Sequence, residues 1–309
     1  MKFFQKIVYN FKCNKQNNID IDNIDDKIIY DNQNKIFNDT LINNNNFDNL
    51  YTKNSNIVLG SGNFGQVYLG KNKNTNNKIA YKCINDEKDT TLYAVREITN
   101  LNLLNNCNII KLLDYNILTN KKILILELCE GKELFDYIIN QKYLNENTAK
   151  KIIKIIINTV DYCHSMLIMH RDIKPENIMF KFYRNYNPKN IKLIDFGLSK
   201  KVLDVKQMNK TQVGTSYYLS PEIIKCNYTI SCDIWSIGIL LYVMLEGHYP
   251  FANESTYKTY KTILKLKYKF YNKISINTKK IIKKLLVYEK NRISLNTLMS
   301  LEWYKQIKI

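Results

Sequence analysis

The sequence lacks any continuous apolar run of the roughly 18 residues that a membrane-spanning helix needs. Its first residues, MKFFQKIVYNFKC, carry a lysine within the apolar run and no small-residue cleavage site, so we expect no signal peptide. Lys2 stands where N-myristoylation requires a glycine. Hydrophobic residues make up 45% of the 309 residues, and the mean hydropathy is −0.34. We therefore predict a soluble globular protein of the cytoplasm or nucleus, without a membrane partner.

Metal-binding patterns are also missing. The 7 cysteines include no Cys-x-x-Cys pair, and no set of cysteines and histidines has the spacing of zinc ligands. The stretch NNIDIDNIDD over 17–26 resembles a calcium-binding loop, but it lacks the glycine at the sixth position and the closing glutamate. We expect neither a zinc site nor an EF-hand.

The chain carries 46 lysines and arginines against 28 acidic residues, a net charge of +18. Such a charge raises nucleic-acid binding as a function. The lysines are spread along the sequence, however, without a basic stripe interleaved with aromatic residues. We expect a solvated basic surface and no nucleic-acid partner. A nucleic-acid binder remains the alternative, which steeply salt-dependent binding to DNA or RNA would reveal.

Composition divides the chain into two parts. Residues 1–50 are rich in Asn and Asp and predict a polar, largely disordered extension. Beyond it, strand patterns come first and helical patterns later, which predicts an α+β fold over 51–305. Its β-rich N-lobe would cover about 51–129 and its helical C-lobe about 130–305.

Local patterns predict the main elements. Strands are expected on both sides of a glycine turn after residue 56, over KIAYKCIN (78–85) and over KILILELC (122–129). Helical spacing is found over 94–104, 231–246 and 278–287, and Asn145 is a predicted N-cap for the run ENTAKKIIKIIINTVDYCHS.

The glycine turn is the first motif that carries chemistry. It reads Gly60-Ser61-Gly62-Asn63-Phe64-Gly65-Gln66-Val67. Glycines let backbone N–H groups approach phosphate oxygens without an intervening Cβ. A Rossmann loop leads from strand to helix, whereas a strand pattern follows here. We predict a phosphate-covering hairpin, with an ordinary glycine hairpin as the alternative.

A lysine lies inside one predicted strand. Lys82 stands within the apolar segment KIAYKCIN, where its desolvation is costly unless it faces a cleft. Glu97, on the following helix, is its predicted partner, and such a pair would hold the ammonium group against the α- and β-phosphates. A surface lysine is the alternative.

Two further motifs follow short apolar strands. HRDIKPEN covers 170–177 and DFG covers 195–197. These motifs supply two carboxylates, Asp172 and Asp195, and the carboxamide of Asn177. One acid could receive a hydroxyl proton while the other acid and the amide oxygen hold Mg²⁺. The set predicts metal-assisted phosphoryl transfer.

In this order and spacing, the motifs resemble the signature of eukaryotic protein kinases over about 51–305. ELCEGKELFDYI, HRDIKPENIMF, LIDFGLSK, GTSYYLSPE and CDIWSIGILLYVMLEGHYPF resemble the catalytic domains of calcium-dependent protein kinases of plants and protozoan parasites, within the calcium/calmodulin-dependent group. The Asn-rich composition resembles that of malaria-type parasites. The resemblance implies a bilobal fold, the cofactors ATP and Mg²⁺, and phosphorylation of protein Ser/Thr hydroxyls.

The resemblance implies roles for the catalytic residues. Asp172 would be the catalytic base, and Lys174 would steady the γ-phosphate, as is typical of Ser/Thr kinases. Lys82, locked by Glu97, would position the α- and β-phosphates. The metal ligands and the nucleotide-binding residues would be Asn177 and Asp195 for Mg²⁺, and Gly60, Ser61, Gly62, Asn63, Phe64, Gly65, Val67, Ala80, Lys82, Glu127, Cys129 and Met179 for ATP. Leu126 would be the gatekeeper, and Glu222 would pair with Arg292.

The resemblance also implies regulation. Thr211 lies three residues before Gly214, where many kinases carry an activation-loop phosphothreonine. Arg171 and Lys200 fall where the family places phosphate-binding cations, so a phosphate on Thr211 could order the loop. This predicts an upstream kinase as a partner. A polar surface threonine is the alternative.

Substrate preference is implied by three positions. Glu133 falls where basophilic relatives bind an arginine three residues before the phosphosite, and Glu176 would assist at position −2. Val243 replaces a glutamate of the cyclic-nucleotide-dependent kinases, so the −2 requirement should be weak. The implied partners are proteins with R-x-x-S/T sites.

Calcium control is not expected from this chain. Only six residues follow Trp303, which leaves no autoinhibitory helix, calmodulin-binding segment or EF-hand. The alternative to an active enzyme is a pseudokinase scaffold that binds partners without turnover.

Overall fold

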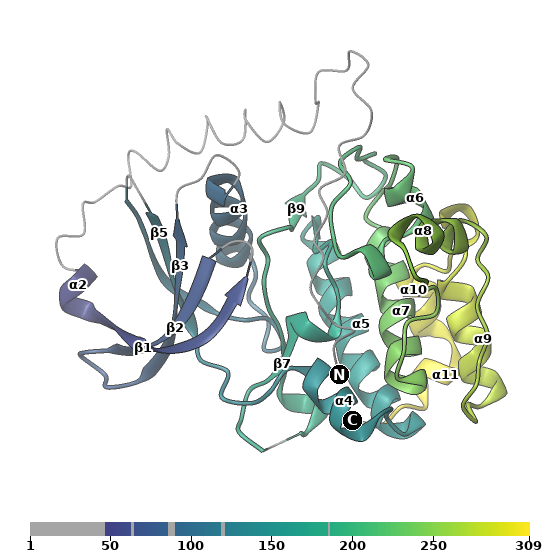
Figure 1. The fold of residues 1–309 in the computed structure, drawn as a ribbon, viewed down its shortest axis with the longest axis horizontal. Helices are drawn as coiled ribbons and strands as arrows, with labels where there is room; N and C mark the ends of the chain where they lie inside the picture. The colour runs from purple at the N-terminus through teal and green to yellow at the C-terminus, as the bar shows by residue number, and fades with distance from the viewer. Residues whose placement is uncertain (1–46, 63–64, 86–89, 119–120, 185) are drawn as a thin grey trace, which may run out of the picture.

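The computed structural model describes residues 47–62, 65–85, 90–118, 121–184 and 186–309. They form a sheet-rich lobe and a helical lobe, which lie on the left and right of Figure 1. Most of the predicted extension, 1–46, and the loop residues Asn63 and Phe64 lie outside the described residues. Within the described part, no helix is both long and apolar enough to span a membrane.

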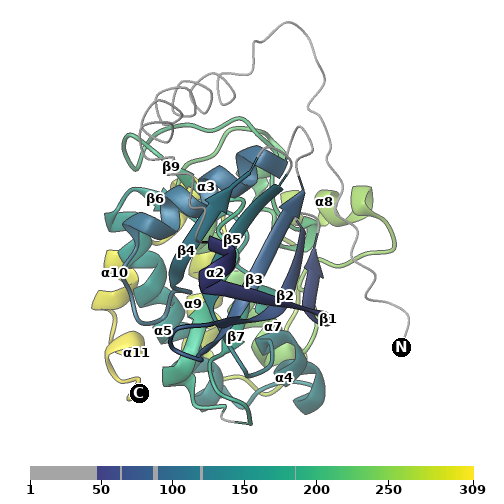
Figure 2. The same ribbon diagram turned by 90° about the vertical axis from the view of Figure 1, so that its left-hand side faces the viewer.

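The N-lobe is built on one antiparallel sheet in the order β1-β2-β3-β5-β4 (Figure 2). Its strands are β1 (Tyr51–Gly62), β2 (Gly65–Asn72), β3 (Lys78–Asn85), β4 (Leu112–Ile117) and β5 (Lys121–Glu127). The glycine turn therefore joins two paired strands, as predicted. The prediction for residues 78–85 matches β3, and that for 122–129 matches most of β5.

Alternation along β3 and β5 divides the N-lobe core. Ala80 and Ile84 belong to the main core with α3 (Thr90–Leu103), whereas Ile79 and Tyr81 pack on the opposite face. Phe47 of α2 (Phe47–Leu50), with 1% of its surface exposed, closes that opposite face. Because side chains of a strand alternate between faces, Lys82 shares the α3 side with Ala80 and Ile84.

The C-lobe is helical, with two small strand pairs near the interlobe side. The elements are α4 (Leu134–Gln141), α5 (Glu146–Ser165), α6 (Pro221–Ile224), α7 (Cys232–Glu246), α8 (Thr256–Leu264), α9 (Ile276–Leu285), α10 (Leu295–Ser300) and α11 (Glu302–Lys305), with β6 (Ile168–Met169) paired to β9 (Lys200–Lys201) and β7 (Ile178–Phe180) to β8 (Ile191–Leu193). Every residue of α7 is buried, because α5 and α9 both pack against it. The α+β bilobal fold is confirmed.

Helix α5 begins as the sequence predicts. The side chain of Asn145 accepts a hydrogen bond from the backbone N–H of Thr148, 2.9 Å away, which caps the helix. In the first turn, the Glu146 carboxylate accepts hydrogen bonds from Ser275 and Thr278 at the start of α9 and pairs with Lys150. Burial would raise the pKa of Glu146, but these donors lower it to about 2.

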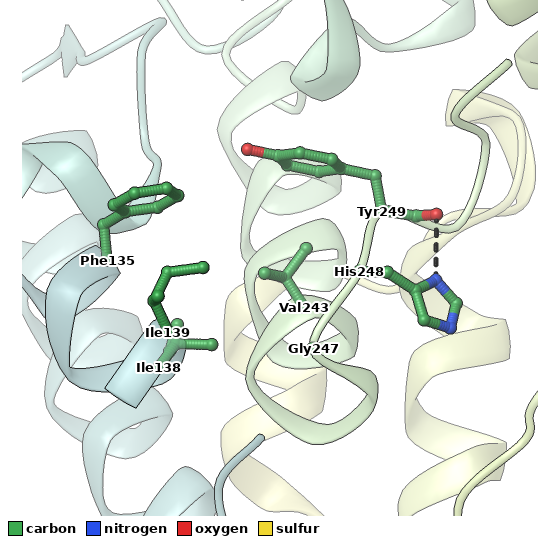
Figure 3. Close-up of a pocket in the computed structure, with 7 residues that line it drawn as sticks. All are labelled: Phe135, Ile138, Ile139, Val243, Gly247, His248 and Tyr249. Carbon is green, nitrogen blue, oxygen red and sulfur yellow. Dashed lines mark hydrogen bonds between the residues drawn. The ribbon is translucent and has the colours of Figure 1, made fainter. Parts of the chain in front are cut away.

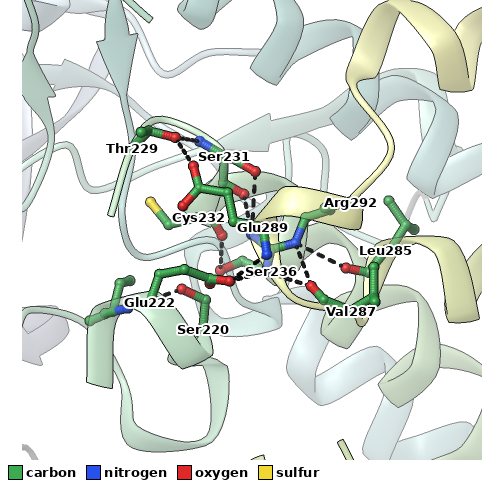
Figure 4. A network of polar contacts seen from close by, with 11 residues as sticks. Ser220, Glu222, Thr229, Ser231, Cys232, Ser236, Leu285, Val287, Glu289 and Arg292 are labelled. Atoms are coloured by element: carbon green, nitrogen blue, oxygen red, sulfur yellow. Dashed lines mark hydrogen bonds and ion pairs between the residues drawn. The ribbon is translucent and has the colours of Figure 1, made fainter. Parts of the chain in front are cut away.

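Arg292 joins three segments of the C-lobe (Figure 4). Its Nη2 lies 3.0 Å from the Glu222 carboxylate, and its Nη1 donates to the carbonyl of Ser231. The guanidinium also donates to the carbonyls of Leu285 and Val287. Only 1% of the Arg292 side chain is exposed, so the predicted Glu222–Arg292 pair is a buried, multiply bonded anchor.

Candidate active site

Lys82 and Glu97 form the predicted ion pair. Lys82 Nζ lies 2.6 Å from Glu97 Oε2 and 2.7 Å from Oε1, with 10% and 1% of the two side chains exposed. Burial would lower the pKa of Lys82, but Asp195 and Glu97 raise it above its ordinary value, so the ammonium group is charged. The helix α3 is thus docked on β3 through this pair.

Asp172 lies at the centre of a polar cluster in the loop after β6. Thr215 Oγ1 donates to Asp172 Oδ1 over 2.9 Å and accepts from Lys174 Nζ over 2.8 Å. Lys174 also contacts the Asp172 carboxylate, and Asn177 Nδ2 donates to Asp172 Oδ2 over 2.8 Å. This arrangement fixes the carboxylate next to a cation and a hydroxyl group. The sequence reasoning missed Thr215, whose position directly after Gly214 was the available signal.

Asp233 of α7 anchors the loop after β6, which carries Asp172. This fully buried carboxylate accepts hydrogen bonds from the backbone N–H groups of His170 and Arg171, both 2.8 Å away, and contacts His164 Nε2 at 2.9 Å. Burial would raise the pKa of Asp233, but these donors lower it. Sequence reasoning placed Asp233 only near the start of a C-lobe helix.

His170 links this loop to the strand before Asp195. Burial lowers the pKa of His170, which favours the neutral ring. Its Nδ1 accepts from the backbone N–H of Asp172, and its Nε2 lies 3.2 Å from the carbonyl of Ile194. The ring also packs edge-on against Phe196. The two catalytic-motif segments are therefore held in register by one side chain.

Asp195 has the donor chemistry expected of a magnesium ligand. Its backbone adopts φ +62°, an unusual conformation for a non-glycine residue that aims the side chain toward Lys82. Burial would raise the pKa of Asp195, but Lys82 and Lys174 lower it, which keeps the carboxylate charged.

The residues present fit Mg²⁺. Within the described part of the chain, Asp195 Oδ2 accepts no hydrogen bond, and Asn177 Oδ1 is equally open because its Nδ2 makes both bonds to Asp172. Two hard oxygen donors on neighbouring segments are what Mg²⁺ binds, usually with phosphate oxygens and water. No cluster of three or more His, Cys, Asp or Glu side chains suited to a metal is found among the described residues.

The nucleotide-binding candidates lie on strands of both lobes and on the linker between them. Ala80 of β3 belongs to the main core, and Val67 of β2 packs against it. Met179 lies on β7, where it forms a β-bridge with Glu133. In the linker between the lobes, the backbone N–H and C=O of Cys129 make no hydrogen bond to the described residues. Both groups are therefore available to an adenine ring.

Glu127 has a structural contact that sequence reasoning did not foresee. Its carboxylate accepts hydrogen bonds from Lys192 Nζ, 2.5 Å away, and from the backbone N–H of Lys111 at 2.9 Å. Lys192 is itself buried on β8. This pair ties the linker to the strand that leads to Asp195.

Glycines shape the turn between β1 and β2. Gly65 has φ +139°, and a Cβ there would lie 2.0 Å from the carbonyl oxygen of Cys83, so no other residue fits. At Gly60, which pairs with Val67 in the β1–β2 ladder, a Cβ would meet nothing within 4 Å, so packing does not require a glycine there. The predicted ligands Asn63 and Phe64 lie outside the described residues.

Two of the proposed regulatory residues, Arg171 and Thr211, lie close together. Arg171 Nη1 lies 3.4 Å from Thr211 Oγ1, and the Tyr228 hydroxyl lies 3.1 Å from the same nitrogen. Lys200, with 2% of its surface exposed, lies at the start of β9. Tyr228 was not foreseen, because nothing in its sequence surroundings marks it.

A small apolar hollow of about 20 Å³ lies between α4 and the end of α7 (Figure 3). Its lining side chains are Phe135, Ile138, Ile139, Val243, His248 and Tyr249, with Gly247. No carboxylate is among these lining residues, and the expected weak requirement at position −2 stays a prediction. Glu133 directly precedes α4. Glu176 lies near Tyr249, whose pKa is raised mainly by burial and further by the negative charge of Glu176.

Comparison with known proteins agrees with this geometry. Residues 53–304 match the protein kinase domain family. The chain is 36% identical over 228 residues to calcium-dependent protein kinase 4 of Plasmodium berghei, covering 69% of this chain and 43% of that protein. It is 38% identical over 208 residues to calcium-dependent protein kinase 5 of Plasmodium falciparum, covering 67% and 36%.

A plant protein gives a similar result. Calcium-dependent protein kinase 12 of Arabidopsis thaliana is 36% identical over 215 residues, covering 68% of this chain and 43% of that protein. The matched regions span less than half the length of each of these three relatives.

Proposed function

Because this chain belongs to the protein kinase family, we propose that it is an active Ser/Thr kinase that transfers the γ-phosphate of Mg-ATP to protein hydroxyl groups. The observation that carries the proposal is the cluster of Asp172, Lys174, Thr215 and Asn177, bonded as described above. Asp195 Oδ1 lies 3.4 Å from Lys82 Nζ, which connects Asp195 to the Lys82–Glu97 pair.

Asp172 is the group that receives the substrate hydroxyl. Its carboxylate is fixed by Thr215 and Asn177, so it can orient the attacking oxygen and accept the hydroxyl proton. Lys174, within contact of the same carboxylate, would neutralise charge that develops on the transferred phosphoryl group. A neutral side chain in place of Lys174 would stabilise this negative charge less well.

Lys82 and the metal ligands would position the nucleotide. Lys82, held by Glu97, would bind α- and β-phosphate oxygens, while Asp195 and Asn177 would hold Mg²⁺. When bound, Mg²⁺ neutralises negative charge on the phosphates. The open backbone groups of Cys129 would orient adenine.

Phosphorylation of Thr211 by an upstream kinase is our proposed activation step. A phosphate there would lie within reach of Arg171, whose Nη1 is 3.4 Å from the threonine oxygen. We expect phosphorylation to raise kcat, and Thr211→Ala to remove that response. Equal kcat for phosphorylated wild type and Thr211→Ala would contradict the proposal.

We also propose a preference for R-x-x-S/T sites. Glu133, before α4, would pair with the arginine three residues before the phosphosite, with Glu176 as a weaker aid. Glu133→Ala should reduce selection for that arginine in a peptide array, while Asp136→Ala, within α4, should not. An unchanged profile for Glu133→Ala would rule this assignment out.

Radiolabelled phosphate transfer to an arginine-directed peptide library tests the function itself. Wild type should incorporate label, and Asp172→Asn should lose it by at least about a thousandfold, since general-base catalysis and orientation are both removed. Asp161→Asn, on α5, is the matched control and should retain activity. No transfer by wild type, even after Thr211 is phosphorylated, would favour a pseudokinase scaffold.

A further inference from the structure

One segment of the C-lobe holds an unusual share of the positive charge. Residues 255–288 contain ten lysines and no aspartate or glutamate, in a chain whose net charge is +18. The segment includes α8 and α9, whose places on the C-lobe are seen in Figure 1. The tertiary structure determines which of these lysines lie close together on the surface.

Four of them line one hollow, which we name the lysine face. Lys258, Lys261, Lys265 and Lys267 surround a space of about 220 Å³ together with Asn253 and Thr262. The first three are spaced by three and four residues, which places them on one side of α8. All four are exposed, whereas the other side of the helix is buried.

The lysine face is largely uncompensated. Lys258 pairs with Glu254, but both side chains are more than half exposed, and such a pair contributes little. In the part of the chain that the structure describes, Lys261, Lys265 and Lys267 take part in no ion pair. The positive charge is therefore available to an anionic partner.

Helix stability does not explain this arrangement. Lys261, in the last turn of α8, is favourably placed for the helix dipole. Lys258 lies in the first turn, however, where a positive charge opposes the dipole. A lysine that works against its own helix suggests a role outside the helix.

The lysine face borders the substrate side of the molecule. Tyr260 of α8 accepts a hydrogen bond from Gln212 Nε2 at 3.4 Å. Gln212 lies three residues before Thr215, which donates to Asp172. Helix α6 also packs against α8. A protein whose hydroxyl group reaches Asp172 would therefore extend past α8.

We propose that the lysine face is a docking surface for an acidic, Asp/Glu-rich segment of the protein substrate, outside the phosphosite. The inference rests on the proposed kinase activity and adds a second recognition element to it. Glu133 and Glu176 would select basic residues next to the phosphosite, whereas the lysine face would select acidic residues farther away. The preferred substrate then carries two regions of opposite charge.

The expected effect lies in KM. Exposed lysine–carboxylate pairs of about 0.2–1 kcal/mol correspond to roughly 1.4- to 5-fold each, so four pairs give at least about 4-fold at low salt, and we expect about tenfold, near the lower end of the range. Salt should weaken the effect because the pairs are exposed. The chemical step is untouched, so kcat should not change.

The test compares peptides with one shared R-x-x-S phosphosite. A flexible Gly/Ser linker joins this site to a block of glutamates or to a block of glutamines, on either side of the phosphosite. Wild type should show a KM about tenfold lower for one glutamate peptide, and this advantage should shrink in high salt. Lys258, Lys261, Lys265 and Lys267 are then changed together to Gln, which should abolish the advantage while kcat for the glutamine peptide stays unchanged.

A charge-matched control separates docking on the lysine face from the electrostatic effect of the protein's overall positive charge. Lys280, Lys283, Lys284 and Lys290 are exposed and do not line the hollow, so their change to Gln should keep the advantage. Equal KM values for the two peptides with wild type, or an advantage that survives in the lysine-face variant, would overturn the proposal.

Fluorescence anisotropy of labelled glutamate peptide tests docking without turnover. If no peptide is phosphorylated, the proposed function fails, while binding that depends on the lysine face still supports docking. Lysine-face-dependent binding of phosphatidylserine vesicles or an oligonucleotide, with no preference for the glutamate peptide, would instead assign this surface to a membrane or nucleic acid and overturn the proposal.

Discussion

Replacement of Asp233 by Asn tests how the catalytic loop is held. The carboxylate accepts the backbone N–H groups of His170 and Arg171 on separate oxygens, with His164 sharing one of them. An asparagine has one carbonyl oxygen and one NH₂ group. In either orientation its NH₂ group faces a backbone N–H, so one buried donor loses its acceptor.

The magnitude follows from these contacts. A hydrogen bond to a charged group is worth about 1.5–3 kcal/mol, and an unsatisfied buried donor costs about 1–3 kcal/mol. We therefore expect Asp233→Asn to lower the free energy of unfolding by about 3–5 kcal/mol. For a chain of this size that corresponds to a fall in Tm of about 6–20 °C.

Activity should fall as well, at temperatures where the variant is folded. Asp172 follows Arg171 directly, and a catalytic group displaced by about 1 Å can cost on the order of a hundredfold in rate. The measurements are thermal unfolding and kcat for peptide phosphorylation. The control is Ser236→Ala on the same helix, which removes one neutral hydrogen bond to Cys232 and should cost about 1 kcal/mol or less. A Tm within about 2 °C of wild type and an unchanged kcat for Asp233→Asn would refute the reasoning.

Three further changes test other contacts. Glu97→Gln should lower kcat/KM for ATP by about 10- to 100-fold, because Lys82 loses its buried carboxylate; an unchanged value in steady-state kinetics would contradict this. Glu146→Gln should cost about 1–2 kcal/mol of unfolding free energy above about pH 5. Since the folded pKa of Glu146 is about 2 against an ordinary 4.5, that difference should disappear as the pH falls through this range. A difference in urea denaturation that stays constant with pH would contradict this argument. Arg292→Lys should cost about 3–5 kcal/mol by urea denaturation, because one ammonium group cannot replace its buried forked contacts; a loss below about 1 kcal/mol would disagree.

Much of the fold could be read from local patterns. The apolar segment KIAYKCIN predicted β3, and Asn145 predicted the start of α5, because both signals depend on residues close in sequence. Helices predicted at 231–246 and 278–287 are found at Cys232–Glu246 and Ile276–Leu285. The bounds shift by a residue or two where capping decides the end, as at Ser275, which caps α9.

The sequence by itself determined the family, the order of the lobes and the chemical groups that could act, because spacing and residue type carry that information. Tertiary structure alone decided which distant groups meet. Thr215 reaches Asp172, Asp233 holds the catalytic loop, Tyr228 reaches Arg171, and four lysines of α8 and its C-terminal end gather around one hollow. The physical reason is that these contacts join residues far apart in the chain or depend on which side of an element faces solvent, and local propensity fixes neither.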